Sequence, residues 1–274
     1  MPHQTARTSR AAAAVDGRAR WRVHGVSLPG YGHLRDGVEC QDACRHGLVE
    51  AAGAQVLAVA DGAGSRARSA EGAALAVGLA VELLGERLAH GAPASPRAWR
   101  ALLAESYEDV VAAFAEATAR MGPDPAAFAA TLTAVVLAYP WLGIMSIGDG
   151  FVIARAEGEA GEEALHLVSS AGPAGEYVNE AVFLSSAGAL SDVAIACLYD
   201  PGLTGVVLGT DGLVPAAIRR AGGRPRPNLS FLVPLLGSLD AERPDPTSVA
   251  RLLLDDRISA LSADDKTLLM AVIG

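Results

Sequence analysis

The sequence has little cysteine and no long apolar run. Its three cysteines, at positions 40, 44 and 197, cannot all be paired within one chain, and no histidine pair accompanies them. This pattern indicates a reducing compartment and argues against a structural zinc site. Because no stretch of about 18 consecutive apolar residues is present, the sequence predicts no transmembrane segment. Residues 1–20 lack the hydrophobic centre of a signal peptide, so we expect a cytoplasmic protein without a membrane partner.

Basic residues are also scarce, at 22 against 31 acidic ones, which gives a formal charge of −9. This balance disfavours nucleic acid as a partner and suits a protein that holds cations. At 274 residues and 51% hydrophobic content, the chain can bury the core of one domain. Residues 1–20 show no sustained periodicity and are predicted to form a mobile N-terminal tail, with residues 21–274 as the folded domain.

The dipeptide Asp-Gly occurs five times, which by itself signals little more than hairpin turns. Three of these pairs are different, because Asp61, Asp149 and Asp211 each follow an apolar run long enough for one buried strand. Two further acids, Asp42 and Asp264, come directly before predicted strands. All five acids are therefore expected at strand ends.

The order of predicted elements favours an α+β fold. Strands are predicted over residues 21–28, 43–49, 55–60, 131–139, 141–147, 151–156, 165–168, 193–198, 203–210 and 267–273. Helices are predicted over residues 65–90, 96–121, 214–220 and 248–261. Residues 29–32 are predicted to break the first strand, with a polar loop over residues 33–40 and another loop over residues 222–227. Because strands come in runs and the two long helices lie together between them, we expect sheets covered by helices.

If the strand ends share one edge of the fold, the five acids form a cluster of carboxylates. Like charges at short range raise one another's pKa unless a cation lies among them. Oxygen ligands completed by water are typical of Mg²⁺ and Mn²⁺ sites. An isolated turn is the simpler explanation for any one acid, but five acids in the same setting favour a metal site.

Six short segments contain or adjoin these acids and the strand between them: Cys40-Gln41-Asp42, Val59-Ala60-Asp61-Gly62-Ala63-Gly64-Ser65, Thr131-Leu132-Thr133-Ala134, Ile147-Gly148-Asp149-Gly150, Gly209-Thr210-Asp211-Gly212 and Asp264-Asp265-Lys266-Thr267. In this order, they resemble the motifs of the bacterial branch of the metal-dependent serine/threonine protein phosphatases of type 2C. The resemblance runs from about Val23 to the end of the chain, and the family's closing motif reads Asp-Asn-x-Thr.

The resemblance implies a four-layer αββα sandwich, in which two packed, mainly antiparallel sheets are flanked by helices. It also implies two or three Mg²⁺ or Mn²⁺ ions, and hydrolysis of phosphoserine or phosphothreonine by a water that bridges the metals. Asp61 and Asp211 are the candidate catalytic acids, with Asp61 bridging two ions. The implied metal ligands are Asp42, Asp61, the Gly62 carbonyl, Asp149, Asp211 and Asp264, of which Asp149 helps to hold a third ion and Asp42 acts directly or through water.

Three departures from the family pattern bear on the phosphate contact and the proton donor. Gln41 replaces a frequent Glu, Gly37 stands where many members carry a phosphate-binding Arg, and Ala63 stands where many carry a His. His33 and Arg35 are the nearest candidates for the missing roles. We expect Arg35 and Gln41 to contact substrate, and His33 to donate a proton to the leaving group or to hold the phosphate.

Residues 169–191 are rich in small and polar residues and are expected to border the site, with Tyr177 and Asn179 contacting substrate. An ordinary connection is the alternative. The resemblance implies a phosphorylated protein as partner and a serine/threonine kinase with opposing action. A catalytically weak relative that serves as a binding or sensing module, and an unrelated metal hydrolase on another fold, are the alternative functions.

Overall fold

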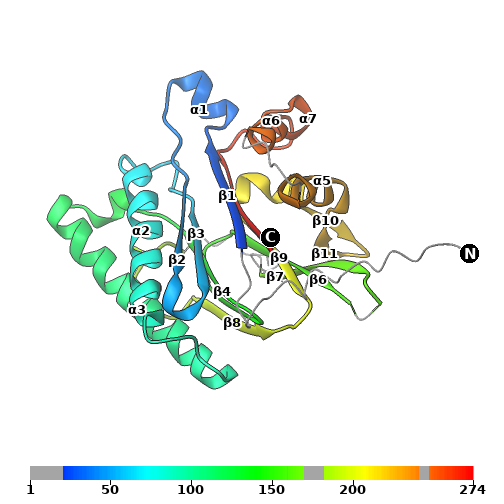
Figure 1. Ribbon diagram of the computed structural model, residues 1–274. Coiled ribbons are helices and arrows are strands. Elements are labelled where there is room, and N and C mark those ends of the chain that lie inside the picture. Colours follow the sequence, from blue (N-terminus) through cyan, green and yellow to red (C-terminus); the bar gives the residue numbers. More distant parts are fainter. Residues whose placement is uncertain (1–20, 159, 170–181, 241–246, 274) are drawn as a thin grey trace, which may run out of the picture.

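The computed structural model describes residues 21–158, 160–169, 182–240 and 247–273 (Figure 1). The predicted tail at residues 1–20 lies outside the described residues, as do Tyr177 and Asn179. Within the described ranges, no helix combines the length and the apolarity needed to cross a membrane.

Two five-stranded antiparallel sheets form the centre of the molecule. The first has the order β2-β3-β4-β5-β8 and contains β2 (Ala43–Val49), β3 (Ala54–Ala60), β4 (Leu132–Ala138), β5 (Trp141–Ile147) and β8 (Ala194–Tyr199). The second has the order β1-β12-β9-β6-β7 and contains β1 (Trp21–Leu28), β12 (Lys266–Ile273), β9 (Leu203–Gly209), β6 (Phe151–Glu157) and β7 (Glu163–Ser169). Every residue of β3, β4, β9 and β12 is buried, which explains their continuous apolar sequences.

Helices cover the outer face of each sheet, as Figure 1 shows. The first sheet is covered by α2 (Ser69–Leu88) and α3 (Pro96–Met121), and the second by α5 (Leu229–Asp240) and α6 (Ser248–Leu253), with the short α4 (Val214–Ala217) and α7 (Asp256–Ser259) beside them. Within the described ranges, the chain also forms the short 3₁₀ turns η2 (Glu50–Ala52), η3 (Pro125–Phe128) and η4 (Asp211–Leu213). The predicted four-layer αββα sandwich is therefore confirmed.

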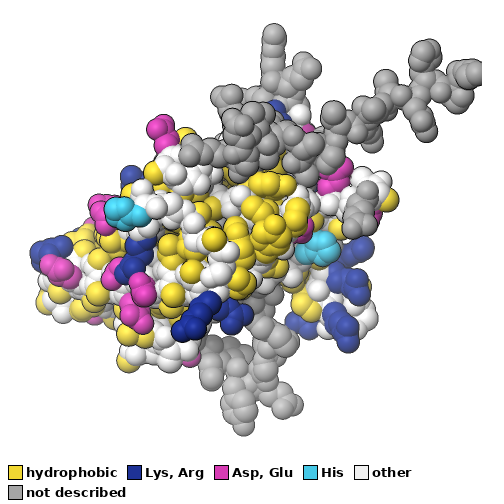
Figure 2. Space-filling model, turned by 60° about the horizontal axis from the view of Figure 1, so that its bottom comes forward, with side chains coloured by type: hydrophobic (Ala, Val, Ile, Leu, Met, Phe, Trp, Pro, Cys, Tyr) yellow, Lys and Arg dark blue, Asp and Glu magenta, His cyan; other side chains and the backbone are white. Residues whose placement is uncertain are grey.

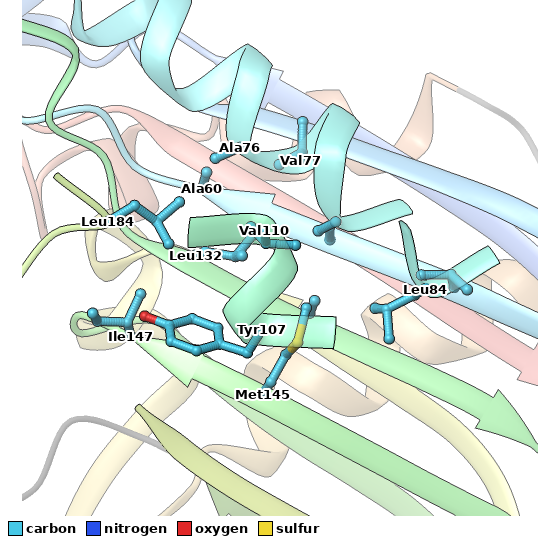
Figure 3. Packing of buried hydrophobic residues seen from close by; sticks show 14 of the residues in the cluster. Ala60, Ala76, Val77, Leu84, Tyr107, Val110, Leu132, Met145, Ile147 and Leu184 are labelled. Atoms are coloured by element: carbon cyan, nitrogen blue, oxygen red, sulfur yellow. The ribbon is translucent and has the colours of Figure 1, made fainter. Parts of the chain in front are cut away.

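Three apolar clusters fill the spaces between the four layers. In the cluster between the first sheet and its helices, Leu132 and Ile147 of the sheet meet Leu84, Tyr107 and Val110 of α2 and α3 (Figure 3). The hydroxyl of Tyr107 donates to the Ala189 carbonyl over 2.9 Å, so this buried phenol keeps a partner. These clusters hold the strand ends in fixed positions.

A helix that was not predicted, α1 (Tyr31–Asp36), covers the end of the predicted break at residues 29–32 and the start of the predicted loop at residues 33–40. Its sequence gave little sign of a helix because it has no side-chain N-cap and no buried residue. Tertiary contacts hold it instead: the Gly32 N–H donates to the Ala263 carbonyl over 3.0 Å, in the turn just before β12.

The C-terminal third differs most from the prediction. The helix predicted over residues 214–220 ends at Ala217, and the predicted loop at 222–227 belongs to a hairpin of β10 (Ile218–Ala221) and β11 (Arg224–Pro227). Helix α5 was not predicted, since it contains Pro234, although it buries Phe231, Leu232, Leu235, Leu236 and Leu239. The single helix predicted over residues 248–261 is divided into α6 and α7.

Candidate metal centre

Three carboxylates meet where strands of both sheets end. Asp61 follows β3 of the first sheet, whereas Asp149 precedes β6 and Asp211 follows β9, both in the second sheet. Each offers one carboxylate oxygen, and these oxygens all lie within 4.8 Å of one another. The sandwich thus brings together acids that are up to 150 positions apart in the sequence (211 minus 61).

Backbone contacts fix the position of Asp61. Its N–H donates to the Thr131 hydroxyl over 2.9 Å, and its carbonyl accepts from the Thr131 N–H over 2.8 Å. The next residue must be glycine, because a Cβ at Gly62 would lie 2.6 Å from the Gln41 carbonyl oxygen and 2.7 Å from that of Ser69. The Asp-Gly pair is therefore a close-packed corner rather than an ordinary hairpin turn.

Asp42 and Asp264 flank the three acids differently. Asp42 is buried, its carboxylate accepts from the Thr210 hydroxyl over 2.7 Å, and Thr210 in turn accepts from the Thr267 N–H over 3.1 Å. Asp264 is exposed and accepts from the Asp265 N–H over 2.9 Å. Both add negative charge around Asp61 and Asp211, which makes the cluster electrostatically unfavourable by itself.

The electrostatics of the cluster favour a bound cation. Burial, followed by repulsion from Asp42 and Asp211, raises the pKa of Asp61 far above its usual range. Burial and the charges of Asp149, Asp264 and Asp42 raise the pKa of Asp211 to about 7. Burial likewise raises the pKa of Asp149, whose Oδ1 is buried without a hydrogen-bond partner among the described residues. Three oxygens in this state suit a hard divalent ion.

One ammonium group, that of Lys266, lies near Asp264 and Asp42 but forms no ion pair with a carboxylate among the described residues. Lys266 is buried, and its Nζ donates to the carbonyls of Ser262 and Asp264 over 3.2 and 3.1 Å. Burial lowers the pKa of Lys266. Its contacts hold the turn that carries Asp264, so its structural role is to shape the turn.

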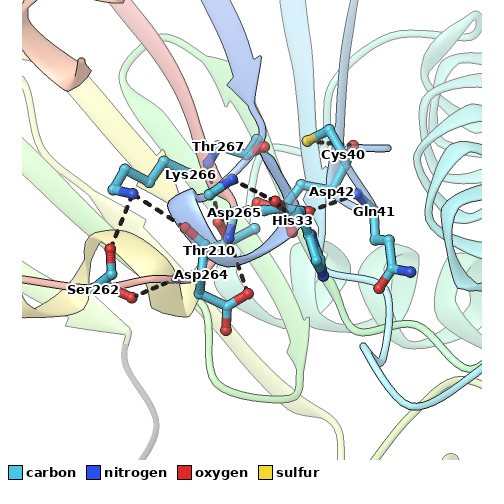
Figure 4. A network of polar contacts seen from close by, with 11 residues as sticks. His33, Cys40, Gln41, Asp42, Thr210, Ser262, Asp264, Asp265, Lys266 and Thr267 are labelled. Carbon is cyan, nitrogen blue, oxygen red and sulfur yellow. Dashed lines mark hydrogen bonds and ion pairs between the residues drawn. The ribbon is translucent and has the colours of Figure 1, made fainter. Parts of the chain in front are cut away.

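Asp265 connects the turn before β12 to the segment between β1 and β2 (Figure 4). Its side chain is 2% exposed, and Oδ1 accepts from the Gly30 N–H over 2.7 Å. The same oxygen lies 2.8 Å from Nδ1 of His33, and Oδ2 accepts from the Gln41 N–H over 2.6 Å. In Figure 4 the second ring nitrogen of His33 points away from Asp265, toward the side on which the Asp264 carboxylate and the Gln41 amide lie.

A comparison of the sequence with family models identifies the family of this chain. Residues 29–254 match the model of the family described as Protein phosphatase 2C. The chain belongs to this family. The resemblance inferred from the six motifs is thereby confirmed.

Individual relatives agree with this family. Serine/threonine-protein phosphatase 3 of Escherichia coli (strain K12) is 28% identical over 261 residues, which cover 92% of this chain and 98% of the relative. The fold is similar to that of the serine/threonine phosphatase Stp1 from Staphylococcus aureus, with a TM-score of 0.62 at 13% identity and coverage of 95% and 98% of the two chains. The Mycobacterium tuberculosis serine/threonine phosphatase PstP/Ppp gives a TM-score of 0.57 at 18% identity, with coverage of 92% and 98%.

The remaining described candidates of this protein phosphatase 2C chain, Gln41 and Arg35, differ in whether their side chains already have partners. The Gln41 side chain extends to the side of the second His33 nitrogen, and its Oε1 is buried without a partner among the described residues. The Arg35 guanidinium pairs with the neighbouring Asp36 over 2.7 and 2.9 Å, and both side chains are more than half exposed. A substrate contact by Arg35 stays a prediction and would require this pair to open.

Sequence reasoning missed two residues that organise the site, Asp265 and Thr210. The burial of Asp265 could have been inferred, because side chains alternate along an extended chain and Asp264, the neighbouring acid, is exposed. The hydrogen bond from Thr210 to Asp42 spans 168 positions and could not be read from local sequence.

Proposed function

We propose that this member of the protein phosphatase 2C family is a Mg²⁺- or Mn²⁺-dependent serine/threonine phosphoprotein phosphatase. The observation that carries the proposal is the convergence of Asp61, Asp149 and Asp211 from two sheets, with ligand oxygens within 4.8 Å of one another. A buried carboxylate oxygen of Asp149 without a hydrogen-bond partner among the described residues supports it, because a cation would complete that atom.

The same residues suit the proposed ions. When bound, two or three such ions would lower the pKa of water and polarise the phosphoryl oxygens. The oxygen donors proposed to hold them are Asp42, Asp61, the Gly62 carbonyl, Asp149, Asp211 and Asp264. Thr210 would keep Asp42 in place through its 2.7 Å hydrogen bond.

His33 is the proposed proton donor to the departing serine or threonine oxygen, or a contact to the phosphate. The carboxylate of Asp265 accepts from Nδ1, so the other ring nitrogen faces the side on which the Asp264 carboxylate lies. Gln41 offers an amide with an unpaired oxygen on the same side. Arg35, and the Tyr177 and Asn179 side chains outside the described residues, remain proposed substrate contacts.

The proposed partner is a phosphorylated protein, whose phosphorylation depends on a serine/threonine kinase. A cytoplasmic location is part of the proposal. It rests on the three cysteines, which are free thiols in the structure.

Replacement of a central acid tests the proposal. In Asp61→Asn or Asp211→Asn, hydrolysis of a phosphothreonine peptide with Mn²⁺ should fall at least ~100-fold, since the lost carboxylate removes charge that the ions require. Circular dichroism should show an intact fold. Asp256→Asn, an exposed acid of α7, is the matched control and should keep full activity.

Two results would count against the proposal. Wild-type turnover in either central variant, with metal still required, would show that these acids do not hold the ions. Stabilisation of the wild-type protein by Mn²⁺ without turnover of any phosphopeptide or aryl phosphate would instead favour the binding or sensing module, in agreement with the absence of a His after Asp61-Gly62.

A further inference from the structure

The hairpin of β10 and β11, residues 218–227, carries an unusual concentration of positive charge. Four of its ten residues are arginines, namely Arg219, Arg220, Arg224 and Arg226, and all four are exposed. In Figure 2, a group of dark blue side chains stands at the right, on the side of the molecule where Figure 1 shows this hairpin. A chain with a formal charge of −9 therefore presents one compact cationic surface, which we call the arginine hairpin.

The strand register places most of this charge on one face. Arg219 lies directly opposite Arg226, and Ala221 lies opposite Arg224. Because opposite residues share a face and successive residues alternate, Arg219, Arg224 and Arg226 point to the same side and Arg220 to the other. Like charges directly opposite each other oppose strand pairing. Among the described residues, no acidic side chain forms an ion pair with any of the four.

The hairpin nevertheless has a fixed shape. Gly222 and Gly223 have φ values of +60° and +76°, which suit a two-residue turn that needs positive φ at both positions. At the base, Asn228 donates from its backbone N–H to the Ala217 carbonyl over 2.7 Å and from its side chain to the Ala216 carbonyl over 2.8 Å. The fixed hairpin holds like charges close together, which indicates that an anionic partner, rather than the protein itself, compensates these charges.

The type of contact follows from the two prolines of β11. Pro225 and Pro227 lack an N–H group, so the outer edge of β11 cannot pair with an added strand. On this side of the hairpin, recognition would use the guanidinium groups, which bind carboxylates and phosphates through paired N–H donors.

The hairpin is close to the metal centre along the chain. Asp211 begins η4, α4 follows directly, and β10 starts at Ile218. At a rise of about 1.5–2 Å per residue in these helical turns, the backbone of Arg219 lies roughly 15 Å from that of Asp211 along the chain. An extended peptide covers that distance in about five residues, at 3.3–3.6 Å each.

We propose that the arginine hairpin binds an acidic segment of the phosphoprotein substrate, about five to eight residues from the phosphorylated residue. The inference rests on the proposed phosphatase function and adds a class of substrate to it: proteins in which Asp, Glu or further phosphorylated residues lie at that spacing. The contact is separate from the reacting phosphate, so it should act on substrate capture rather than on the chemical step.

The test compares phosphothreonine peptides that differ only in one segment. In each pair, one peptide carries four Asp or Glu residues five to eight positions from the phosphothreonine, and the other carries Asn or Gln at those positions. In the first pair this segment comes before the phosphothreonine, and in the second pair it comes after it. With Mn²⁺ and low salt, the wild-type protein should hydrolyse the acidic peptide of at least one pair with ~10-fold higher kcat/KM, mainly through KM. The preference should weaken as salt screens the charges.

The variant Arg219→Gln/Arg224→Gln/Arg226→Gln should lose this preference while it hydrolyses p-nitrophenyl phosphate as the wild type does. A matched control, Arg97→Gln/Arg100→Gln/Arg120→Gln, removes the same charge from exposed positions of α3 and should keep the preference. The aryl phosphate rate also shows that each variant is folded and active.

Equal turnover of the acidic and neutral peptides by the wild type would overturn the inference and leave the phosphatase function intact. Indifference to the peptides together with hairpin-dependent sedimentation on phosphatidylserine vesicles would assign the surface to a membrane instead. No turnover of any peptide or of the aryl phosphate would overturn the proposed function, and this inference with it.

Discussion

Replacing Asp265 by Asn should destabilise this protein, although Asn is the residue that the family pattern has at this position. The carboxylate is 2% exposed and accepts from two backbone N–H groups and from His33. An Asn side chain has one acceptor and one donor end, so whichever way it turns, either the Gly30 N–H or the Gln41 N–H meets an NH₂ group. At least one backbone donor therefore loses its partner.

The magnitude follows from these contacts. An unsatisfied buried donor costs about 1–3 kcal/mol, and the remaining hydrogen bonds lose the strengthening that an ionised acceptor gives. We expect a loss of about 2–4 kcal/mol in the free energy of unfolding, which at about 2 °C per kcal/mol for a chain of this size lowers the melting temperature by roughly 4–8 °C. Asp265→Ala, which removes all three contacts, should lose more.

The assay is thermal unfolding in EDTA, so that metal binding does not contribute. Asp264→Asn is the matched control: it removes the neighbouring exposed carboxylate and should change the melting temperature little, because it eases repulsion with Asp61 and Asp211. Long-range ¹H–¹⁵N spectra of the His33 ring provide a second readout, since loss of the Asp265 acceptor should alter the tautomer balance. Wild-type melting and an unchanged His33 ring in Asp265→Asn would refute the network.

Two further predictions concern pH and His33. In the folded, metal-free protein the pKa values of Asp61 and Asp211 lie above the ordinary 3.8, and that of Asp211 is about 7. Because of these raised pKa values, the folded state binds more protons than the unfolded state, so the melting temperature in EDTA should fall from pH 5 to pH 8. The fall should be less steep in Asp211→Asn, and equal slopes in both proteins would contradict this. Mn²⁺ should raise the melting temperature more at pH 8 than at pH 6. His33→Ala should lower phosphothreonine peptide turnover at least ~10-fold with metal affinity intact. Aryl phosphate should be affected less if His33 donates the proton and equally if it holds the phosphate, while unchanged rates on both would remove His33 from the mechanism.

The fold could be predicted from sequence where burial is complete. Strands such as β3 and β9 are covered on both faces, so their apolar runs identify them without knowledge of their neighbours. The helix α1 and the hairpin β10–β11 have few or no buried side chains, and their formation depends on contacts with distant segments or on a turn. Local periodicity carries no information about such elements.

The acids of the candidate site could also be predicted, because each ends or precedes a strand and the Asp-Gly corner requires glycine at Gly62. The hydrogen-bond partners around these acids could not be predicted from the sequence. The hydrogen bond between His33 and Asp265 joins residues 232 positions apart, and that between Thr210 and Asp42 joins residues 168 positions apart.

His33 and Asp265 belong together in the structure, although they lie far apart in the sequence. His33 precedes Gln41 in the chain, and Asp265 stands where the family pattern has Asn. The 2.8 Å contact between His33 and Asp265 makes them one unit, because only a carboxylate can accept at once from an imidazole N–H and from both backbone donors. The two sites should therefore be non-additive: Asp265→Asn should cost less stability in the His33→Ala background than in the wild type, by the amount that this contact contributes. Additive losses in the double variant would mean that Asp265 serves the backbone alone, and that His33 takes its orientation from elsewhere.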